Sequence, residues 1–106
     1  MQISVSRSGG GGYLARLEGI LDRDSVPELR KKLLKLAKKK KINNLEVELS
    51  GVTSIDTAGI ALMVELMRFL SRKNGKLRLE GANEHVRRMI HLARLDMIFG
   101  MNTRNG

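Results

Sequence analysis

The sequence of 106 residues has no cysteine, no tryptophan, one proline and few aromatic residues. The absence of cysteine excludes disulfide bonds and thiolate chemistry. Tyr13, Phe69 and Phe99 are too few to form a platform on which single-stranded nucleic acid could stack. No apolar run is long enough to span a bilayer, and the N-terminus lacks a signal-peptide pattern. We therefore expect a cytoplasmic protein with no segment inserted in a membrane.

The composition is ordinary for a globular protein, because 42% of the residues are hydrophobic and 29% are charged. A chain of this length corresponds to one domain of common size with a modest core. We expect residues 1–106 to form that single domain.

Basic residues outnumber acidic residues by 20 to 11, which gives a formal net charge of +9. A charge of this size is compatible with a nucleic-acid or anionic-lipid partner. Four lysines at positions 38–41, however, directly follow the apolar positions of the first expected helix, where cations complement the negative end of the helix dipole. We interpret this run as a solvated helix end. The sequence contains no known nucleic-acid-binding motif, so a nucleic-acid partner is not expected.

Four segments alternate apolar and polar residues with the period of a β-strand. They lie around Ile3 and Val5 and at residues 13–18, 45–49 and 77–80. Glycines at positions 9–12 indicate a hairpin connection between the first two strands. Residues 96–99 form either a short edge strand or a tucked end.

Three further segments carry apolar residues at spacings of three and four, which is typical of amphipathic helices. Ser25 and Glu28 have the spacing of a capping box at the start of the first helix, which we expect to end before Asn43. Asn74 marks a left-handed stop after the second helix. Asn83 is a good N-cap for the third.

The helical spacing also predicts which side chains are buried, and it places Leu66 on the buried stripe of the second helix. The other expected core positions are Val26, Leu29, Leu33, Leu36, Ala37, Ile60, Met63, Val64, Met67, Leu70, Val86, Met89, Ile90 and Ala93. The order β-β-α-β-α-β-α predicts an α/β layer structure with a four- to five-stranded mixed sheet and helices packed on one face.

The chain changes from strand to helix within residues 54–59, Ser-Ile-Asp-Thr-Ala-Gly. Unpaired backbone N–H groups and the helix dipole favour a negative charge or a phosphate at such a point. Asp56 and Thr57 are both good N-cap residues, and Gly59 permits a close backbone approach. The Thr57 hydroxyl therefore has two alternative roles, as a helix cap or as a site for phosphate.

The residues give little support to catalysis, a metal site or a cofactor. A hydroxyl nucleophile needs a nearby base, and neither His85 nor His91 is close to Thr57 in the sequence. The two histidines are six residues apart and lie on different faces of a helix, which argues against a shared metal site. The carboxylates that could form a cluster are Asp22, Asp24 and Asp56. Carboxylates at loop and helix starts are more often caps than catalytic groups, so we expect a protein that is not an enzyme.

Residues 49–60, Leu-Ser-Gly-Val-Thr-Ser-Ile-Asp-Thr-Ala-Gly-Ile, closely resemble the signature of STAS domains. These small modules occur as bacterial anti-sigma factor antagonists and as parts of some transporters. Residues 19–22, Asn74 with Gly75, and residues 92–99 are also similar to the corresponding segments of the family. The resemblance covers roughly the whole chain and implies the same α/β fold.

The anti-sigma factor antagonists of this family imply one function for the chain. In these proteins the unphosphorylated domain binds an anti-sigma factor that is also a serine kinase, and this binding frees a sigma factor. The kinase then phosphorylates the hydroxyl that corresponds to Thr57, which ends the interaction. The resemblance thus implies a non-catalytic, protein-binding module with Thr57 as phospho-acceptor. The implied partner-binding residues are Asp22, Asp24, Ser54, Asp56, Thr57, Ala58 and Gly59.

The alternative is a cytoplasmic accessory subunit of a lipid-transporting ABC system, bound to the ATPase of that system. Residues 56–62, Asp-Thr-Ala-Gly-Ile-Ala-Leu, are more similar to this branch of the family. The short segment after Phe99 also fits this branch, because many anti-sigma factor antagonists continue into a further helix. The sequence leaves both alternatives open, and a fold alone does not decide between them.

Overall fold

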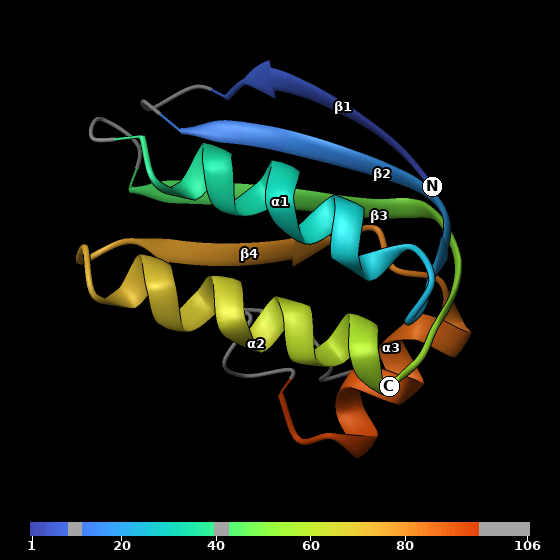
Figure 1. Cartoon of the computed structure of the whole chain (residues 1–106). Helices are drawn as coiled ribbons and strands as arrows, with labels where there is room; N and C mark the ends of the chain where they lie inside the picture. Colours follow the sequence, from blue (N-terminus) through green and yellow to red (C-terminus); the bar gives the residue numbers. More distant parts are fainter. Residues whose placement is uncertain (9–11, 40–42, 96–106) are drawn as a thin grey trace.

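Four strands and three helices alternate along the chain in the computed structural model, which describes residues 1–8, 12–39 and 43–95 (Figure 1). The strands are β1 (Gln2–Arg7), β2 (Tyr13–Leu21), β3 (Asn44–Ile55) and β4 (Lys76–Glu80). The helices are α1 (Val26–Ala37), α2 (Thr57–Ser71) and α3 (Glu84–Leu92). The expected α/β fold is confirmed. Residues 96–99, expected as a fifth strand or a tucked end, lie outside the described residues.

The strands form one mixed sheet in the order β1-β2-β3-β4. β1 and β2 are antiparallel, whereas β2 pairs with β3, and β3 with β4, in parallel. Each parallel pair needs a crossover connection, which α1 and α2 supply. In β3, the side chains of Leu45, Val47 and Leu49 are fully buried and alternate with the partly exposed Glu46 and Glu48. The sheet therefore has one apolar face toward the core.

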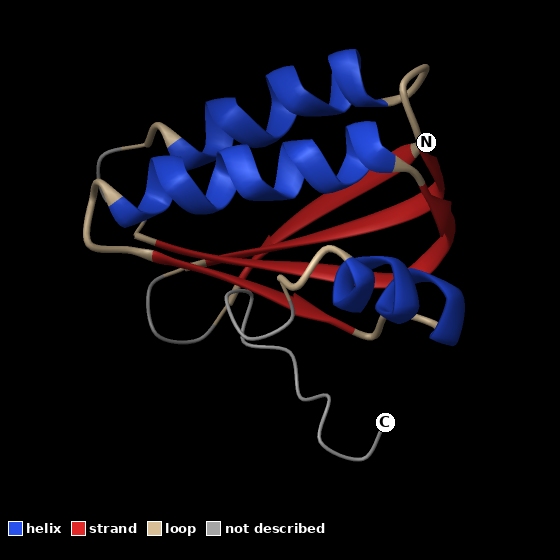
Figure 2. Ribbon diagram, turned by 90° about the horizontal axis from the view of Figure 1, so that it is seen from below, coloured by secondary structure: helices blue, strands red, loops and turns tan. Residues whose placement is uncertain are grey.

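α1 and α2 lie side by side on this apolar face (Figure 2). Leu33 of α1 and Leu66 of α2 are fully buried, and both belong to the hydrophobic core between the helices and the sheet. The burial of Leu66 confirms its expected place. Among the described helices, none has the length and apolar character needed to cross a lipid bilayer.

α3 lies at the β4 edge of the sheet and packs against the second half of β3 (Figure 2). This half is open because β4 pairs only with residues 44–48 of β3. The Asn83 side-chain amide donates hydrogen bonds to the carbonyl oxygens of Val52 (3.1 Å) and Thr53 (3.3 Å), and its oxygen accepts from the Val86 N–H (2.8 Å). Asn83 thus caps α3, as expected, and also satisfies the open strand edge.

The start of α1 differs from the expected capping box. The Ser25 hydroxyl accepts a hydrogen bond from the Asp22 N–H (3.0 Å) and donates one to the Ile20 carbonyl oxygen (2.7 Å). It makes no capping bond to the helix, and the Glu28 carboxylate lies 3.9 Å from the Lys32 ammonium instead. The capping-box prediction is therefore wrong, because the preceding loop uses the hydroxyl.

α1 also ends earlier than expected, at Ala37 and not near Asn43. The Lys73 ammonium, at the end of α2, donates hydrogen bonds to the carbonyl oxygens of Ala37 (2.7 Å) and Lys39 (2.8 Å). These carbonyl groups are thereby satisfied without further helix turns. Asn74 adopts the left-handed conformation expected after α2, with φ of 61°.

The expected core positions are largely correct in α1 and less so in α2 and α3. Leu62 is buried although the spacing did not single it out. Ala93 follows α3 and is exposed, so its expected burial is wrong. Expected positions that are only half-buried are Val26, Ile60, Val64, Met67 and Met89. α2 carries apolar residues on almost every side, so periodicity could not define its buried face.

Candidate functional site

The candidate site lies where β2 and β3 end and where α1 and α2 begin (Figure 1). Parallel neighbouring strands end at the same edge of a sheet, so the loops after them meet there. The Arg23 N–H donates a hydrogen bond to Asp56 Oδ2 (3.2 Å), and the Asp56 N–H donates one to the Leu21 carbonyl oxygen (3.1 Å). These bonds hold the 22–25 loop against the start of α2.

Asp56 is the N-cap of α2. Its Oδ1 atom accepts hydrogen bonds from the Ala58 N–H (2.9 Å) and the Gly59 N–H (3.1 Å). These two backbone donors are therefore already occupied. The expectation that unpaired N–H groups at this helix start would receive a phosphate is wrong for both of them.

Gly59 lets the first turn of α2 approach the sheet closely. A Cβ atom at this position would lie 2.8 Å from the Leu21 carbonyl oxygen and 2.6 Å from Ile55 Cγ1. Both distances are shorter than side chains normally tolerate, and the carbonyl group cannot rotate away. Gly59 is buried and allows this close packing of α2, so it is not itself accessible to a second protein.

Thr57 is the first residue of α2, and it is exposed. Within the part of the chain that the structure describes, its hydroxyl has no hydrogen-bond partner. The alternative that Thr57 caps the helix is therefore wrong, because Asp56 performs that role. The hydroxyl is open to solvent and to a second protein.

The 22–25 loop is held by its own side chains. Asp22 Oδ1 accepts hydrogen bonds from the Asp24 N–H (3.0 Å) and the Ser25 N–H (3.1 Å). Asp22 is half-buried and organises the loop, whereas Asp24 is exposed. Asp24 is therefore the carboxylate of this loop that is most open to a partner.

The remaining expected site residues, Ser54 and Ala58, are half-buried at the end of β3 and in the first turn of α2. The structure thus brings the predicted site residues to one edge of the sheet. We call the accessible part the Thr57 surface, which comprises Asp22, Asp24, Ser54, Asp56, Thr57 and Ala58.

A groove of about 520 Å³ lies beside the 22–25 loop, between the start of β1, the end of β2 and α1, and the sequence did not indicate it. Its apolar wall includes Ile20, which is 52% exposed, and Met1, which is 40% exposed. The register of β2 shifts between Gly19 and Ile20, and Gly19 has φ of 120°. Ile20 nevertheless keeps the alternation of β2, in which Ala15, Leu17 and Leu21 are buried and Arg16, Glu18 and Ile20 are exposed. Ile20 and Leu21 are two apolar residues in succession in a strand, so one of them must face outward, and this was the signal in the sequence. The other lining residues are Ile3, Asp22, Asp24, Ser25, Glu28, Leu29 and Lys32.

The described residues provide the Thr57 surface with neither a base bonded to the hydroxyl nor a cluster of metal ligands. His85 and His91 are exposed on α3, and no base forms a hydrogen bond with the Thr57 hydroxyl among the described residues. In residues 1–8, 12–39 and 43–95, no group of three or more His, Asp or Glu side chains could hold a metal ion. The surface offers a free hydroxyl beside carboxylates.

The fold is shared with several solved structures. The Thermotoga maritima protein TM1081 is 23% identical, with a TM-score of 0.82, over 97% of this chain and 88% of that protein. The phosphorylated form of Bacillus SpoIIAA, a cell fate determinant and anti-sigma factor antagonist, is 18% identical, with a TM-score of 0.74, over 98% and 94%. A segment of the murine anion transporter Slc26a9 is 17% identical, with a TM-score of 0.73, over 87% of this chain and 15% of the transporter. At these identities the matches show the fold.

A comparison with curated proteins gave no match. The family is shown by a match between the sequence and a family model. The family model described as "Mlab, STAS domain" matches residues 4–101, nearly the whole chain. The chain therefore belongs to the STAS domain family.

Proposed function

We propose that residues 1–106 form one cytoplasmic, non-catalytic regulatory domain that binds a protein partner through the Thr57 surface. The observation that carries this proposal is the exposed Thr57 hydroxyl, which has no bonding role in the described structure although it lies at a rigidly held helix start. Asp56 and Gly59 provide the rigidity. A preformed surface loses little conformational entropy when a partner binds.

We infer that phosphorylation of Thr57 switches the binding off. A phosphate adds about 1.5 to 2 negative charges. Asp56 already occupies the N–H groups of Ala58 and Gly59, so the phosphate would project into solvent beside the Asp56 and Asp24 carboxylates. It would change the surface that the partner meets and leave the fold as it is. A partner that buries this surface would have to desolvate the added charge, which costs binding energy.

The first candidate partner is an anti-sigma factor that is also a serine kinase. Bacillus SpoIIAA, which shares the fold, is an anti-sigma factor antagonist with structures in phosphorylated and unphosphorylated forms. The kinase would bind the unphosphorylated chain and transfer a phosphoryl group from ATP to the Thr57 oxygen, with release of ADP.

The second candidate partner is the ATPase of an ABC-type phospholipid transport system. It is favoured by the family match, because the matching model is described as Mlab, and by residues 56–62, which are more similar to that branch. In this case the Thr57 surface binds the ATPase, either constitutively or under the control of Thr57 phosphorylation.

Isothermal titration with each candidate partner, taken from the genes next to this one, tests the proposal. Thr57→Ser should bind like wild type, and Thr57→Glu should bind at least about tenfold more weakly. Ser6→Glu is the matched control, because it adds the same charge at an exposed position on β1, far from the surface. If Thr57→Glu folds and binds as tightly as wild type, Thr57 is not a switch. To distinguish the two candidate partners, wild type and Thr57→Ala are incubated with ATP and the kinase, and mass spectrometry detects any added phosphate. Phosphorylation of wild type but not of Thr57→Ala would identify the kinase as the partner.

A further inference from the structure

The net positive charge of the chain is concentrated in three segments. Residues 5–14, 36–45 and 66–77 contain nine of the 20 Lys and Arg and none of the 11 Asp and Glu. The 11 basic residues elsewhere equal the acidic residues in number. The whole excess of +9 therefore belongs to these segments, and the rest of the chain is neutral.

The structure brings the described parts of these three segments together at one end of the molecule. The Lys73 ammonium, after α2, bonds to the carbonyl oxygens of Ala37 and Lys39, after α1. The Lys39 ammonium lies 5.2 Å from the centre of the Tyr13 ring, and the Arg7 guanidinium lies 5.8 Å from it. We call this region the cationic end. Its described cations are Arg7, Lys38, Lys39, Arg72, Lys73 and Lys76.

The charge of this end exceeds what helix capping requires. The C-termini of α1 and α2 each carry roughly half a negative charge. Lys73 already bonds to the last carbonyl groups of α1. Lys38, Lys39, Arg72 and Lys76 remain exposed. Lys38 and Lys39 are thus part of a larger surface that the linear sequence did not reveal, since Arg72 and Lys76 come from a distant segment.

We propose that the cationic end binds the anionic headgroups of a phospholipid membrane peripherally, without insertion. Lysines predominate among its cations, and lysine acts as a mobile point charge that suits a fluid array of headgroups. The Tyr13 and Phe69 rings are half-buried under cations and offer no open face for base stacking.

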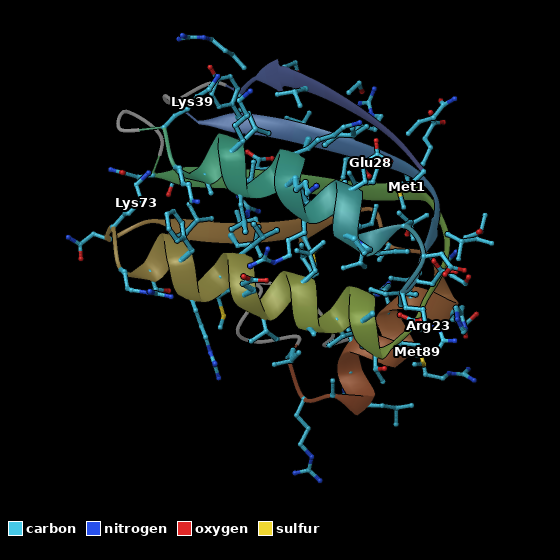
Figure 3. The ribbon with its side chains drawn as sticks, in the orientation of Figure 1. Met1, Arg23, Glu28, Lys39, Lys73 and Met89 are labelled. Atoms are coloured by element: carbon cyan, nitrogen blue, oxygen red, sulfur yellow. The ribbon has the colours of Figure 1, made fainter. Side chains whose placement is uncertain are left out.

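The cationic end and the Thr57 surface lie at opposite ends of the molecule. Lys39 and Lys73 are at one end in Figure 3, and Arg23, next to the Thr57 surface, is at the other. α1 and α2 run between these ends, with N-termini at the site and C-termini at the cations. A protein held by the cationic end would therefore keep the Thr57 surface directed away from the membrane.

Vesicle co-sedimentation tests the proposal with a charge-matched pair of variants. The first replaces Lys38, Lys39, Arg72 and Lys76 with Gln. The control replaces four exposed cations elsewhere with Gln, namely Arg16, Lys31, Arg88 and Arg94. Both variants have the same net charge, and circular dichroism checks that both are folded. The vesicles are phosphatidylcholine alone, or phosphatidylcholine with phosphatidylserine.

At physiological salt, wild type should bind the phosphatidylserine vesicles and not those of phosphatidylcholine. Each cation near an anionic surface contributes about fivefold to binding, so the first variant should bind more than about a hundredfold more weakly. The control should lose less than about tenfold, because its cations do not face the membrane. Three outcomes would overturn the proposal: no binding of wild type to phosphatidylserine vesicles, equal losses in both variants, or tighter binding of a DNA duplex that the first variant abolishes.

Discussion

At the scale of single residues, Asp56 has a large structural influence on the Thr57 surface, because its carboxylate accepts from one backbone N–H group in the 22–25 loop and two in the first turn of α2. Asp56→Ala removes the cap of α2 and the link to Arg23. We expect the free energy of unfolding to fall by about 1 to 2 kcal/mol, measured by urea denaturation. Asp56→Asn retains an acceptor for the cap and should lose less. Equal stability of Asp56→Ala and wild type would contradict the capping geometry.

Thr57 has no comparable role in stability. Thr57→Ala and Thr57→Ser should each change the free energy of unfolding by less than about 0.5 kcal/mol, because the side chain is exposed and Asp56 supplies the cap. Thermal or urea unfolding of the two variants checks this expectation. A loss above about 1 kcal/mol in Thr57→Ala alone would mean that the hydroxyl caps the helix after all.

The sequence predicted the place of this surface but not which of Asp56 and Thr57 caps α2. Asp56 and Thr57 are both good N-cap residues, so residue type could not decide between them. The choice depends on which side chain points toward the N–H groups of Ala58 and Gly59, and this is set by the extended backbone of Asp56, with φ of −112° and ψ of −172°. The Asp56 N–H also bonds to the Leu21 carbonyl oxygen, which is a contact between distant segments that a local pattern does not contain.

At the scale of elements, α2 is the helix on which the core depends most directly. Leu66→Asp would bury an unpaired charge in a fully inaccessible position, so we expect a loss above about 4 kcal/mol or an unfolded chain. Leu92→Asp makes the same chemical change at a position that is 69% exposed, at the end of α3, and should cost less than about 1 kcal/mol. Circular dichroism melts of both variants test the difference. Similar melting temperatures would show that the buried face of α2 is misassigned.

α1 and α2 are also joined by an ion pair on their outer side. The Arg30 guanidinium donates to both carboxylate oxygens of Glu65, at 2.7 and 2.5 Å. This hydrogen bonding lowers the pKa of Glu65 from its ordinary value of 4.5. A lowered pKa contributes stability above the unfolded value, and this contribution disappears as the pH falls through the folded value.

Glu65→Gln should therefore lower the melting temperature slightly at pH 7 and leave it unchanged at a pH well below the pKa of the carboxyl group. The effect is small because both side chains are partly exposed to water. Glu80→Gln is a suitable control, since Glu80 pairs with Arg78 within a single strand. A larger difference at low pH than at pH 7 would reverse the sign and contradict the pairing.

Element types were predictable from sequence, whereas several boundaries were not. Alternation and helical spacing identified every strand and helix in the described residues. The early end of α1 depends on Lys73, which is 36 residues away from Ala37 in sequence. The continuation of β3 to Ile55, beyond the expected residue 49, depends on its pairing with β2. Both are tertiary effects that a local pattern does not contain.

At the scale of the whole molecule, the two ends are expected to act independently. The variant with Lys38, Lys39, Arg72 and Lys76 changed to Gln should bind the protein partner with unchanged affinity, apart from a salt-dependent change in association rate. Surface plasmon resonance at two salt concentrations measures both quantities. A faster dissociation of this variant would show that the partner also contacts the cationic end.

The strand order allows the sheet to assemble while the chain is being synthesised. Each strand pairs with the strand that precedes it in sequence, so the sheet extends at one edge and no strand has to enter between two others. A chain leaving the ribosome can complete one pairing as soon as the next strand emerges. α3 comes last among the described elements and covers the edge of β3 that β4 leaves open. The order of translation is thus the order in which the domain can assemble, with β1 as a constant edge on one side and each new strand added on the other.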